Sequence, residues 1–141
     1  PLVLDPRGMT SDAAQARKLA AFRAADVALA ASGTVSLELA AAETPMVIAY
    51  DMNWISRHMI KAALRIDTVT LVNLVSETRT VPEFLGAGCK PAAIANALSD
   101  LLSIPGAREA QISAMAETML RLGKGGDPPG LRAARAVLSE N

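Results

Sequence analysis

Apolar and polar positions along this chain alternate between two patterns. Short apolar runs that could be buried strands occupy residues 2–4, 26–30 and 46–50. Longer stretches with apolar residues at helical spacing occupy residues 12–24, 34–43, 54–65, 90–102, 107–122 and 131–138. Strands that alternate with helices of this length are typical of a parallel sheet wrapped by helices.

Three segments are less regular. Residues 69–71 are predicted to be extended and to continue through 72–75 into a loop, and residues 83–85 are predicted to form a short helical turn. Residues 123–130 are rich in glycine and proline, which excludes a regular element there. We therefore predict an α/β domain over residues 1–122, a partial Rossmann-like parallel sheet with flanking helices, and a linker with a C-terminal helix over 123–141.

Composition narrows the classes of function. The chain has 141 residues, of which 51% are hydrophobic and 3% aromatic, and its formal net charge is zero. A neutral chain offers no electrostatic basis for nucleic acid as the main partner. A single cysteine, Cys89, excludes an internal disulfide and fits a reducing cytoplasm. The only histidine, His58, has no second metal ligand at a useful spacing, so we predict no metal site and no cofactor.

Residues 26–50 carry the strongest functional signal. Ser32, Gly33 and Thr34 lie between a predicted strand and a predicted helix, where unpaired backbone amides and the positive end of a helix dipole can bind a diphosphate. Glu38 lies one helical turn after Thr34, and its carboxylate could reach back to accept hydrogen bonds from a ribose. The alternatives are a plain helix cap and a solvated acid.

Other candidates are weaker. Asn73 follows a predicted strand and could bind a sugar or base, although loop asparagines more often form turns. Arg79 and Glu83 could pair with each other or face the site. The predicted helix 54–65 has a basic side and an apolar side, which fits an anionic lipid surface or ordinary packing on the sheet; its membrane-facing candidates are Trp54, Arg57 and Lys61.

These pieces in this order resemble the lipid-A-disaccharide synthases, glycosyltransferases with the two-domain GT-B architecture. The matching segments are residues 25–29, 31–34 with Leu37 and Glu38, 45–50, 70–74 and 81–85. The family pattern Ser-Leu-Pro-Asn-Leu appears here with Thr70 and Val72 at the serine and proline positions. The resemblance covers about residues 1–105 well and the remainder loosely.

The resemblance implies a function and a set of contacts. The family transfers 2,3-diacylglucosamine from its UDP derivative to 2,3-diacylglucosamine 1-phosphate, which forms the lipid A disaccharide and releases UDP. The resemblance implies that Ser32, Gly33 and Thr34 contact the diphosphate and that Glu38 contacts the ribose. It also implies that Asn73 contacts the donor or the reacting centre. Arg79 and Glu83 would shape the site. The catalytic base would lie in an N-terminal domain, so no catalytic residue is assigned here.

The same resemblance implies that the chain is the donor-binding part of a longer enzyme, without its first strand or two, and inactive alone. We expect cytoplasmic location at the inner face of the inner membrane, with a lipid acceptor as second substrate. The last helix would expose an apolar face, which favours a homodimer formed by exchange of that helix. The alternatives are a non-catalytic nucleotide-binding or assembly domain of GT-B type and another enzyme that acts on a UDP-sugar.

Overall fold

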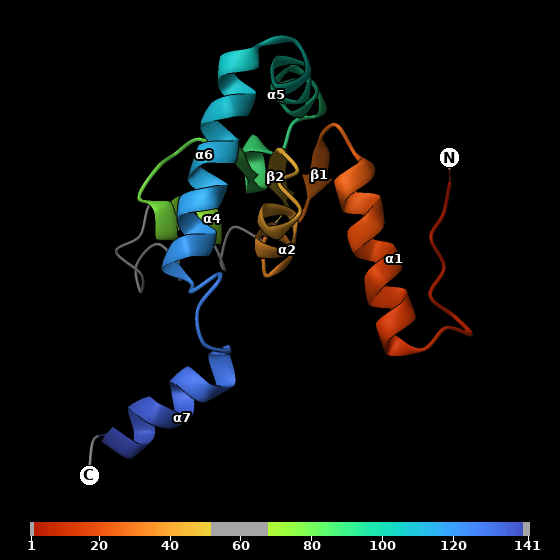
Figure 1. Ribbon diagram of the computed structural model, residues 1–141. Helices are drawn as coiled ribbons and strands as arrows, with labels where there is room; N and C mark the ends of the chain where they lie inside the picture. Colours follow the sequence, from red (N-terminus) through yellow and green to blue (C-terminus); the bar gives the residue numbers. More distant parts are fainter. Residues whose placement is uncertain (1, 52–67, 140–141) are drawn as a thin grey trace.

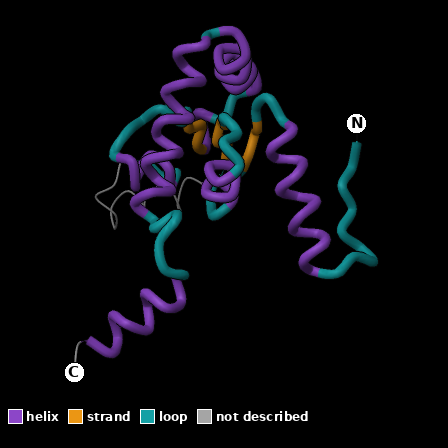
Figure 2. Tube along the Cα trace, viewed as in Figure 1, coloured by secondary structure: helices purple, strands orange, loops and turns teal. Residues whose placement is uncertain are grey.

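A computed structural model describes residues 2–51 and 68–139. In this part of the chain, three strands form one sheet, and helices pack around it, except for the last helix, which extends away (Figures 1 and 2). The elements in chain order are α1 (Ser11–Ala24), β1 (Ala28–Ala30), α2 (Val35–Ala41), β2 (Met46–Tyr50), α4 (Leu71–Ser76), β3 (Glu83–Leu85), the 3₁₀ turn η1 (Gly86–Gly88), α5 (Pro91–Ser103), α6 (Pro105–Arg121) and α7 (Pro129–Ser139).

The sheet is parallel throughout, in the order β1-β2-β3. Ala30 pairs with Ile48, which in turn pairs with Glu83. Because neighbouring strands run in the same direction, the loops that follow β1, β2 and β3 all leave from one edge of the sheet. This arrangement confirms the predicted fold class, a partial Rossmann-like α/β domain with a C-terminal helix.

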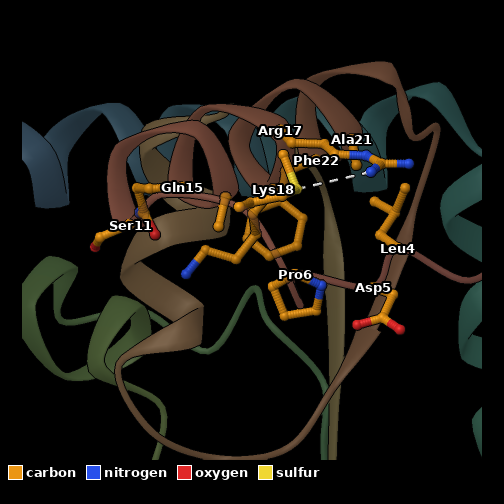
Figure 3. A pocket seen from close by; sticks show the side chains of 11 residues that line it. Leu4, Asp5, Pro6, Ser11, Gln15, Arg17, Lys18, Ala21 and Phe22 are labelled. Atoms are coloured by element: carbon orange, nitrogen blue, oxygen red, sulfur yellow. Dashed lines mark hydrogen bonds between the residues drawn. The ribbon is translucent and has the colours of Figure 1, made fainter.

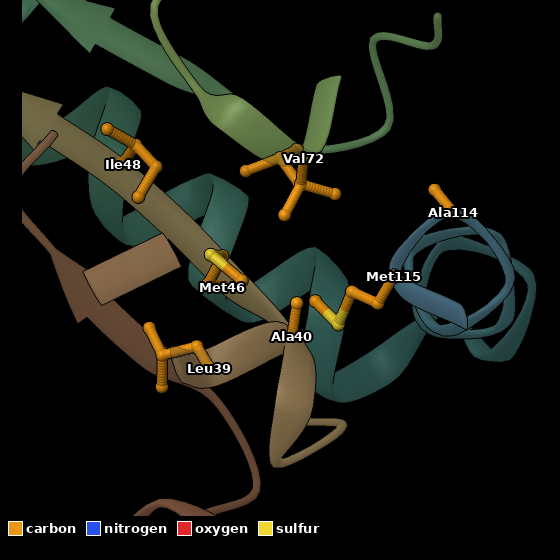
Figure 4. Close-up of a cluster of buried hydrophobic side chains, with 8 residues drawn as sticks. Leu39, Ala40, Met46, Ile48, Val72, Ala114 and Met115 are labelled. Carbon is orange, nitrogen blue, oxygen red and sulfur yellow. The ribbon is translucent and has the colours of Figure 1, made fainter. Parts of the chain in front are cut away.

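The hydrophobic core lies between β2 and three helices. Helix α6 contacts α2, α4 and α5, and α5 also contacts β2. Figure 4 shows the side chains that meet there. The buried cluster comprises Leu39 and Ala40 from α2, Met46 and Ile48 from β2, Val72 from α4, Val81, and Ala114 and Met115 from α6. The positions of α2 and α4, which flank the candidate site, are therefore set by burial of apolar surface.

Helix α1 lies beside β1 (Figure 1). It begins after Thr10, whose hydroxyl accepts a hydrogen bond from the Ala13 amide at 3.3 Å, as expected for an N-cap. Phe22 packs against the core cluster, and its carbonyl accepts a hydrogen bond of 2.7 Å from the hydroxyl of Thr44. These contacts join α1 to the body of the domain.

Helix α7 begins at Pro129, so the prediction that residues 123–130 contain no regular element is wrong at its end, because proline fits the first turn of a helix. The helix extends away from the sheet, beyond α6 (Figure 1). Its residues Leu131, Val137 and Leu138 are 42%, 70% and 73% exposed. The predicted apolar face of the last helix therefore lies open to solvent. In the described ranges, none of the helices has the length and apolar character needed to cross a bilayer.

The prediction of a buried strand at residues 2–4 is wrong. These residues form no strand, and the exposed fractions of Leu2, Val3 and Leu4 are 86%, 78% and 38%. A strand requires a partner, and no strand of the described residues pairs with this segment. The turn that follows is present: the Met9 amide donates to the Pro6 carbonyl at 3.1 Å. The Arg7 guanidinium, hydrogen-bonded to Asp5, lowers the pKa of that carboxyl.

Two further local predictions are wrong. Residues 71–76 form α4, where an extended segment and a loop were predicted. The valines there favour extended structure, but burial of Val72 and Asn73 against neighbouring elements selects the helix. Residues 83–85 form β3, where a helical turn was predicted, because this segment pairs with β2. In both places tertiary contacts override local preference.

The predicted helix 54–65 lies outside the described residues. The membrane-facing candidates Trp54, Arg57 and Lys61, and His58, lie there as well.

Candidate functional site

Within the described ranges, the loop between β1 and α2 presents free backbone amides at the carboxyl edge of the sheet. It leaves the carboxyl end of β1, and Gly33 and Thr34 are exposed. Gly33 has φ +128, a conformation that favours glycine, and a side chain there would meet nothing within 4 Å. Among the described residues, the Gly33, Thr34 and Val35 amides have no acceptor, whereas the Ser36 amide donates to the Gly33 carbonyl at 3.2 Å. These amides therefore remain available to a ligand.

Glu38 is half-buried in the first turn of α2 and has a partner that the sequence did not predict. The ammonium of Lys18, on α1, lies 2.7 Å from its carboxylate. The side chains of Lys18 and Glu38 are 40% and 34% exposed. An ion pair this exposed contributes at most about 1 kcal/mol to stability. Glu38 can therefore exchange Lys18 for another donor at small cost.

A cavity of about 390 Å³ lies between the N-terminal segment and α1, and Lys18 is one of the residues that line it (Figure 3). Pro6 and Phe22 border it, and the stem of Lys18 contributes to its wall. The lining residues are Leu4, Asp5, Pro6, Met9, Ser11, Ala14, Gln15, Arg17, Lys18, Ala21 and Phe22. None of the site residues predicted from the sequence is among them, so this cavity is separate from the β1–α2 loop.

Asn73 is buried in α4, at 1% exposure. Its amide nitrogen donates to the Val81 carbonyl at 2.8 Å, and its amide oxygen accepts from the Val81 backbone amide at 3.0 Å. Both groups of the side chain that could read a sugar or a base are thus engaged within the protein. The sequence placed Asn73 in a loop, whereas the structure places it inside a helix.

Glu83 opens β3, and its carboxylate faces the segment that precedes α4. It accepts hydrogen bonds from the Thr68 hydroxyl, from the Val69 amide at 3.2 Å and from the Thr70 amide at 2.7 Å. The Asn73 amide nitrogen lies 3.4 Å away. These bonds hold the Glu83 carboxylate against residues 68–73, a segment that the sequence had not related to it.

Arg79 lies on the exposed loop between α4 and β3, where its guanidinium donates to the Thr78 carbonyl. Thr70 is 1% exposed, and its hydroxyl oxygen is the buried side-chain polar atom of the described residues that has no hydrogen-bond partner. Thr70 lies directly before α4, and its own backbone amide is one of those that donate to Glu83.

The structure therefore groups the predicted site residues into two sets. Glu83 contacts both residues 68–70 and the Asn73 side chain, and the Ser32 hydroxyl reaches the same segment by donating to the Val69 carbonyl at 3.4 Å. Glu38 turns toward α1 instead. Sequence reasoning missed Lys18, for which helical spacing offered no signal. It also missed the hydroxyls of Thr68 and Thr70, a Thr-x-Thr pattern three residues before Asn73 that could have marked a polar cluster.

A comparison with protein families decides the lineage. Residues 9–124 match the family model described as lipid-A-disaccharide synthetase. The chain belongs to this family. The resemblance inferred from the sequence is thereby confirmed, and it covers α1 through α6, including both sets of site residues.

Individual relatives agree with the family assignment. A lipid-A-disaccharide synthase of Ruegeria pomeroyi is 61% identical over 138 residues, which are 98% of this chain and 34% of the relative. Enzymes of the same name from Rhodospirillum centenum and Bradyrhizobium diazoefficiens are 45% and 42% identical over 88% and 89% of this chain. The chain spans about a third of the length of these curated relatives.

Proposed function

We propose that this chain is the donor-binding part of a glycosyltransferase of lipid A biosynthesis. The complete enzyme transfers 2,3-diacylglucosamine from its UDP derivative to 2,3-diacylglucosamine 1-phosphate, with release of UDP. Family membership supports the reaction class. The observation that carries the donor role is the β1–α2 loop, with three backbone amides free of acceptors among the described residues, at the carboxyl edge of a parallel sheet.

The roles proposed for the site residues come from the family resemblance, and the geometry of the loop supports them. The amides of Gly33 and Thr34 bind the diphosphate, and the Ser32 hydroxyl lies at the same turn. Glu38 accepts hydrogen bonds from the ribose after release or sharing of Lys18. Arg79 and Glu83 shape the site around α4, and Asn73, whose two amide groups bind Val81, holds α4 in place. We assign no catalytic base and no metal or cofactor to this chain.

The experiment that tests the donor role is calorimetry with UDP, UMP and GDP. We expect UDP to bind more tightly than UMP, because the loop amides bind the second phosphate, and more tightly than GDP. Glu38→Ala should weaken UDP binding by about 10- to 100-fold, since hydrogen bonds to a charged group contribute about 1.5–3 kcal/mol. Equal affinity for all three nucleotides would contradict the proposal, and absence of binding would leave a scaffold domain.

Two control variants separate the ribose contact from other effects. Lys18→Met removes the ion pair with α1 but keeps the Glu38 carboxylate, so its UDP affinity should not fall. Glu109→Ala makes the same acid-to-alanine change on the exposed side of α6 and should bind like wild type. If Lys18→Met lost as much affinity as Glu38→Ala, the ion pair itself would explain the loss.

The exposed face of α7 supports a homodimer formed by exchange of this helix. Leu131, Val137 and Leu138 offer apolar surface that another copy can bury. Size-exclusion chromatography with light scattering should show a dimer for the wild-type chain and a monomer for Leu138→Asp. A wild-type monomer at high concentration would exclude this arrangement.

Because the donor and the acceptor carry acyl chains, the complete enzyme is proposed to act as a peripheral protein at the cytoplasmic face of the inner membrane. Trp54, Arg57 and Lys61 are proposed to face the lipid from sequence alone, since they lie outside the described residues. Co-sedimentation of wild type and of Arg57→Ala/Lys61→Ala with vesicles of anionic lipid tests this placement.

A further inference from the structure

One carboxylate joins two segments of the candidate site. Glu83, at the start of β3, accepts hydrogen bonds from three consecutive residues, 68–70, and lies within 3.4 Å of the Asn73 amide nitrogen. Thr70 precedes α4 but makes no side-chain cap of that helix. The Glu83 carboxylate therefore lies beside the start of α4, where negative charge is favourable, and binds the amides of the two residues that precede the helix.

Asn73 also connects α4 to the residues that precede β3. Its two hydrogen bonds to the Val81 backbone tie α4 to the residue that lies two positions before Glu83. The Thr78 amide also donates to the Asn73 carbonyl, at 3.0 Å. Segment 68–73 is thus bound to the entry of β3 at several points, and β3 is bound to β2 by the sheet.

The β1–α2 loop rests on this connected unit. The Ser32 hydroxyl donates to the Val69 carbonyl at 3.4 Å, and the Val69 amide donates to Glu83 at 3.2 Å. The peptide group between Val69 and Thr70 links the carboxylate to the loop, because its carbonyl accepts from Ser32 and its N–H, the Thr70 amide, donates to Glu83 at 2.7 Å. A change in the hydrogen bonds of Glu83 moves the acceptor that Ser32 uses.

We infer that Glu83 is a positioning residue for the nucleotide site, acting through Val69 on Ser32 and thereby on the amides of the loop at 32–34. This inference rests on the proposed function and assigns Glu83 an indirect role in it. Asn73 belongs to the same supporting unit, because both of its amide groups bind Val81. Neither side chain needs to touch the donor in order to affect its binding.

The test uses the protein at its full encoded length and a double-mutant cycle. UDP affinity is measured by calorimetry for wild type, Glu83→Gln, Ser32→Ala and the double variant. Glutamine keeps the shape of the side chain and one acceptor oxygen, but it loses the charge and adds a donor toward amides that also donate. We expect the UDP affinity of Glu83→Gln to be about 3- to 10-fold lower than that of wild type. The double variant should bind UDP no more weakly than the single variant with the lower affinity.

Additivity is the outcome that overturns the inference. Residues that act on a ligand independently give multiplicative losses, whereas residues in one chain of contacts do not. If the double variant showed the product of the two single losses, Glu83 would affect nucleotide binding independently of Ser32. Glu109→Gln makes the same chemical change on exposed α6 and should leave UDP affinity as in wild type.

Hydrogen exchange without nucleotide separates this inference from the proposed function. Glu83→Gln should speed exchange of the amides in 68–70 and of the Ser36 amide, which donates to the Gly33 carbonyl. If the amides of 68–70 and of Ser36 both exchange faster but the protein binds no UDP, Glu83 supports the β1–α2 loop and the proposed nucleotide binding is rejected. Unchanged exchange at Ser36, with UDP still bound by wild type, would reject the connection and retain the site.

Discussion

Replacing Gln111 by methionine is expected to lower the free energy of unfolding by about 2–4 kcal/mol, because two buried backbone groups lose their partners. Gln111 lies on α6 and is 0% exposed. Its amide oxygen accepts from the Met46 amide at 2.9 Å, and its amide nitrogen donates to the Met46 carbonyl at 3.0 Å. Methionine fills a similar volume but offers neither hydrogen bond.

The position of Met46 explains why this glutamine matters. Alternate residues of a strand direct their backbone groups to the same side, and the Ile48 amide donates to the Pro82 carbonyl on the β3 side. Strand β3 begins opposite Ile48. Met46 therefore lies beyond the reach of β3, and Gln111 takes the place of a neighbouring strand.

Urea unfolding followed by circular dichroism measures this effect, with the slope checked for two-state behaviour. Gln15→Met provides a matched control, because Gln15 is an exposed helical residue of α1 and should change stability by less than about 0.5 kcal/mol. Equal stability of Gln111→Met and wild type would mean that the Met46 groups find other partners.

Replacing Asn73 by leucine is expected to lower the free energy of unfolding by a similar amount, about 2–4 kcal/mol. The variant leaves the Val81 amide and carbonyl without the Asn73 side chain, and Val81 is only 2% exposed. Leucine restores apolar volume, so the loss reports on the hydrogen bonds. Because α4 then loses its connection to the entry of β3, UDP affinity should fall together with stability.

Asn96→Leu on α5 is the control for this variant. Asn96 is exposed, and leucine has the higher helix propensity, so stability should stay level or rise slightly. Thermal unfolding of both variants gives the comparison. A stable Asn73→Leu protein with greatly reduced UDP affinity would instead indicate that the amide contacts the donor directly.

Elements with their own local signal were predictable from the sequence. β2 was predicted at its observed bounds, since 46–50 is a continuous apolar run after a proline. The residues around Thr10 marked the start of α1 and Pro91 marked the first turn of α5, whereas α6 begins at Pro105, two residues before its predicted start. The Ser32-Gly33-Thr34 turn was predictable because a glycine between a strand and a helix indicates a tight bend.

Side-chain partners were not predictable in the same way. Nothing in the sequence relates Lys18 to Glu38, or Gln111 to Met46, because each pair is brought together by the packing of separate elements. The same reason explains the errors at 71–76 and 83–85. At 71–76 the valines favoured an extended segment. At 83–85 the triplet Glu-Phe-Leu is compatible with either a helical turn or a strand.

The sequence alone thus determined the α/β class, the order of most elements and the lineage of this chain, because periodicity, caps and short motifs are local properties. Only the tertiary structure decided that Asn73 and Glu83 bind backbone of their own chain and that Glu38 faces α1. Hydrogen-bond partners depend on which surfaces the core brings together, and burial of Leu39, Val72 and Met115 sets that arrangement.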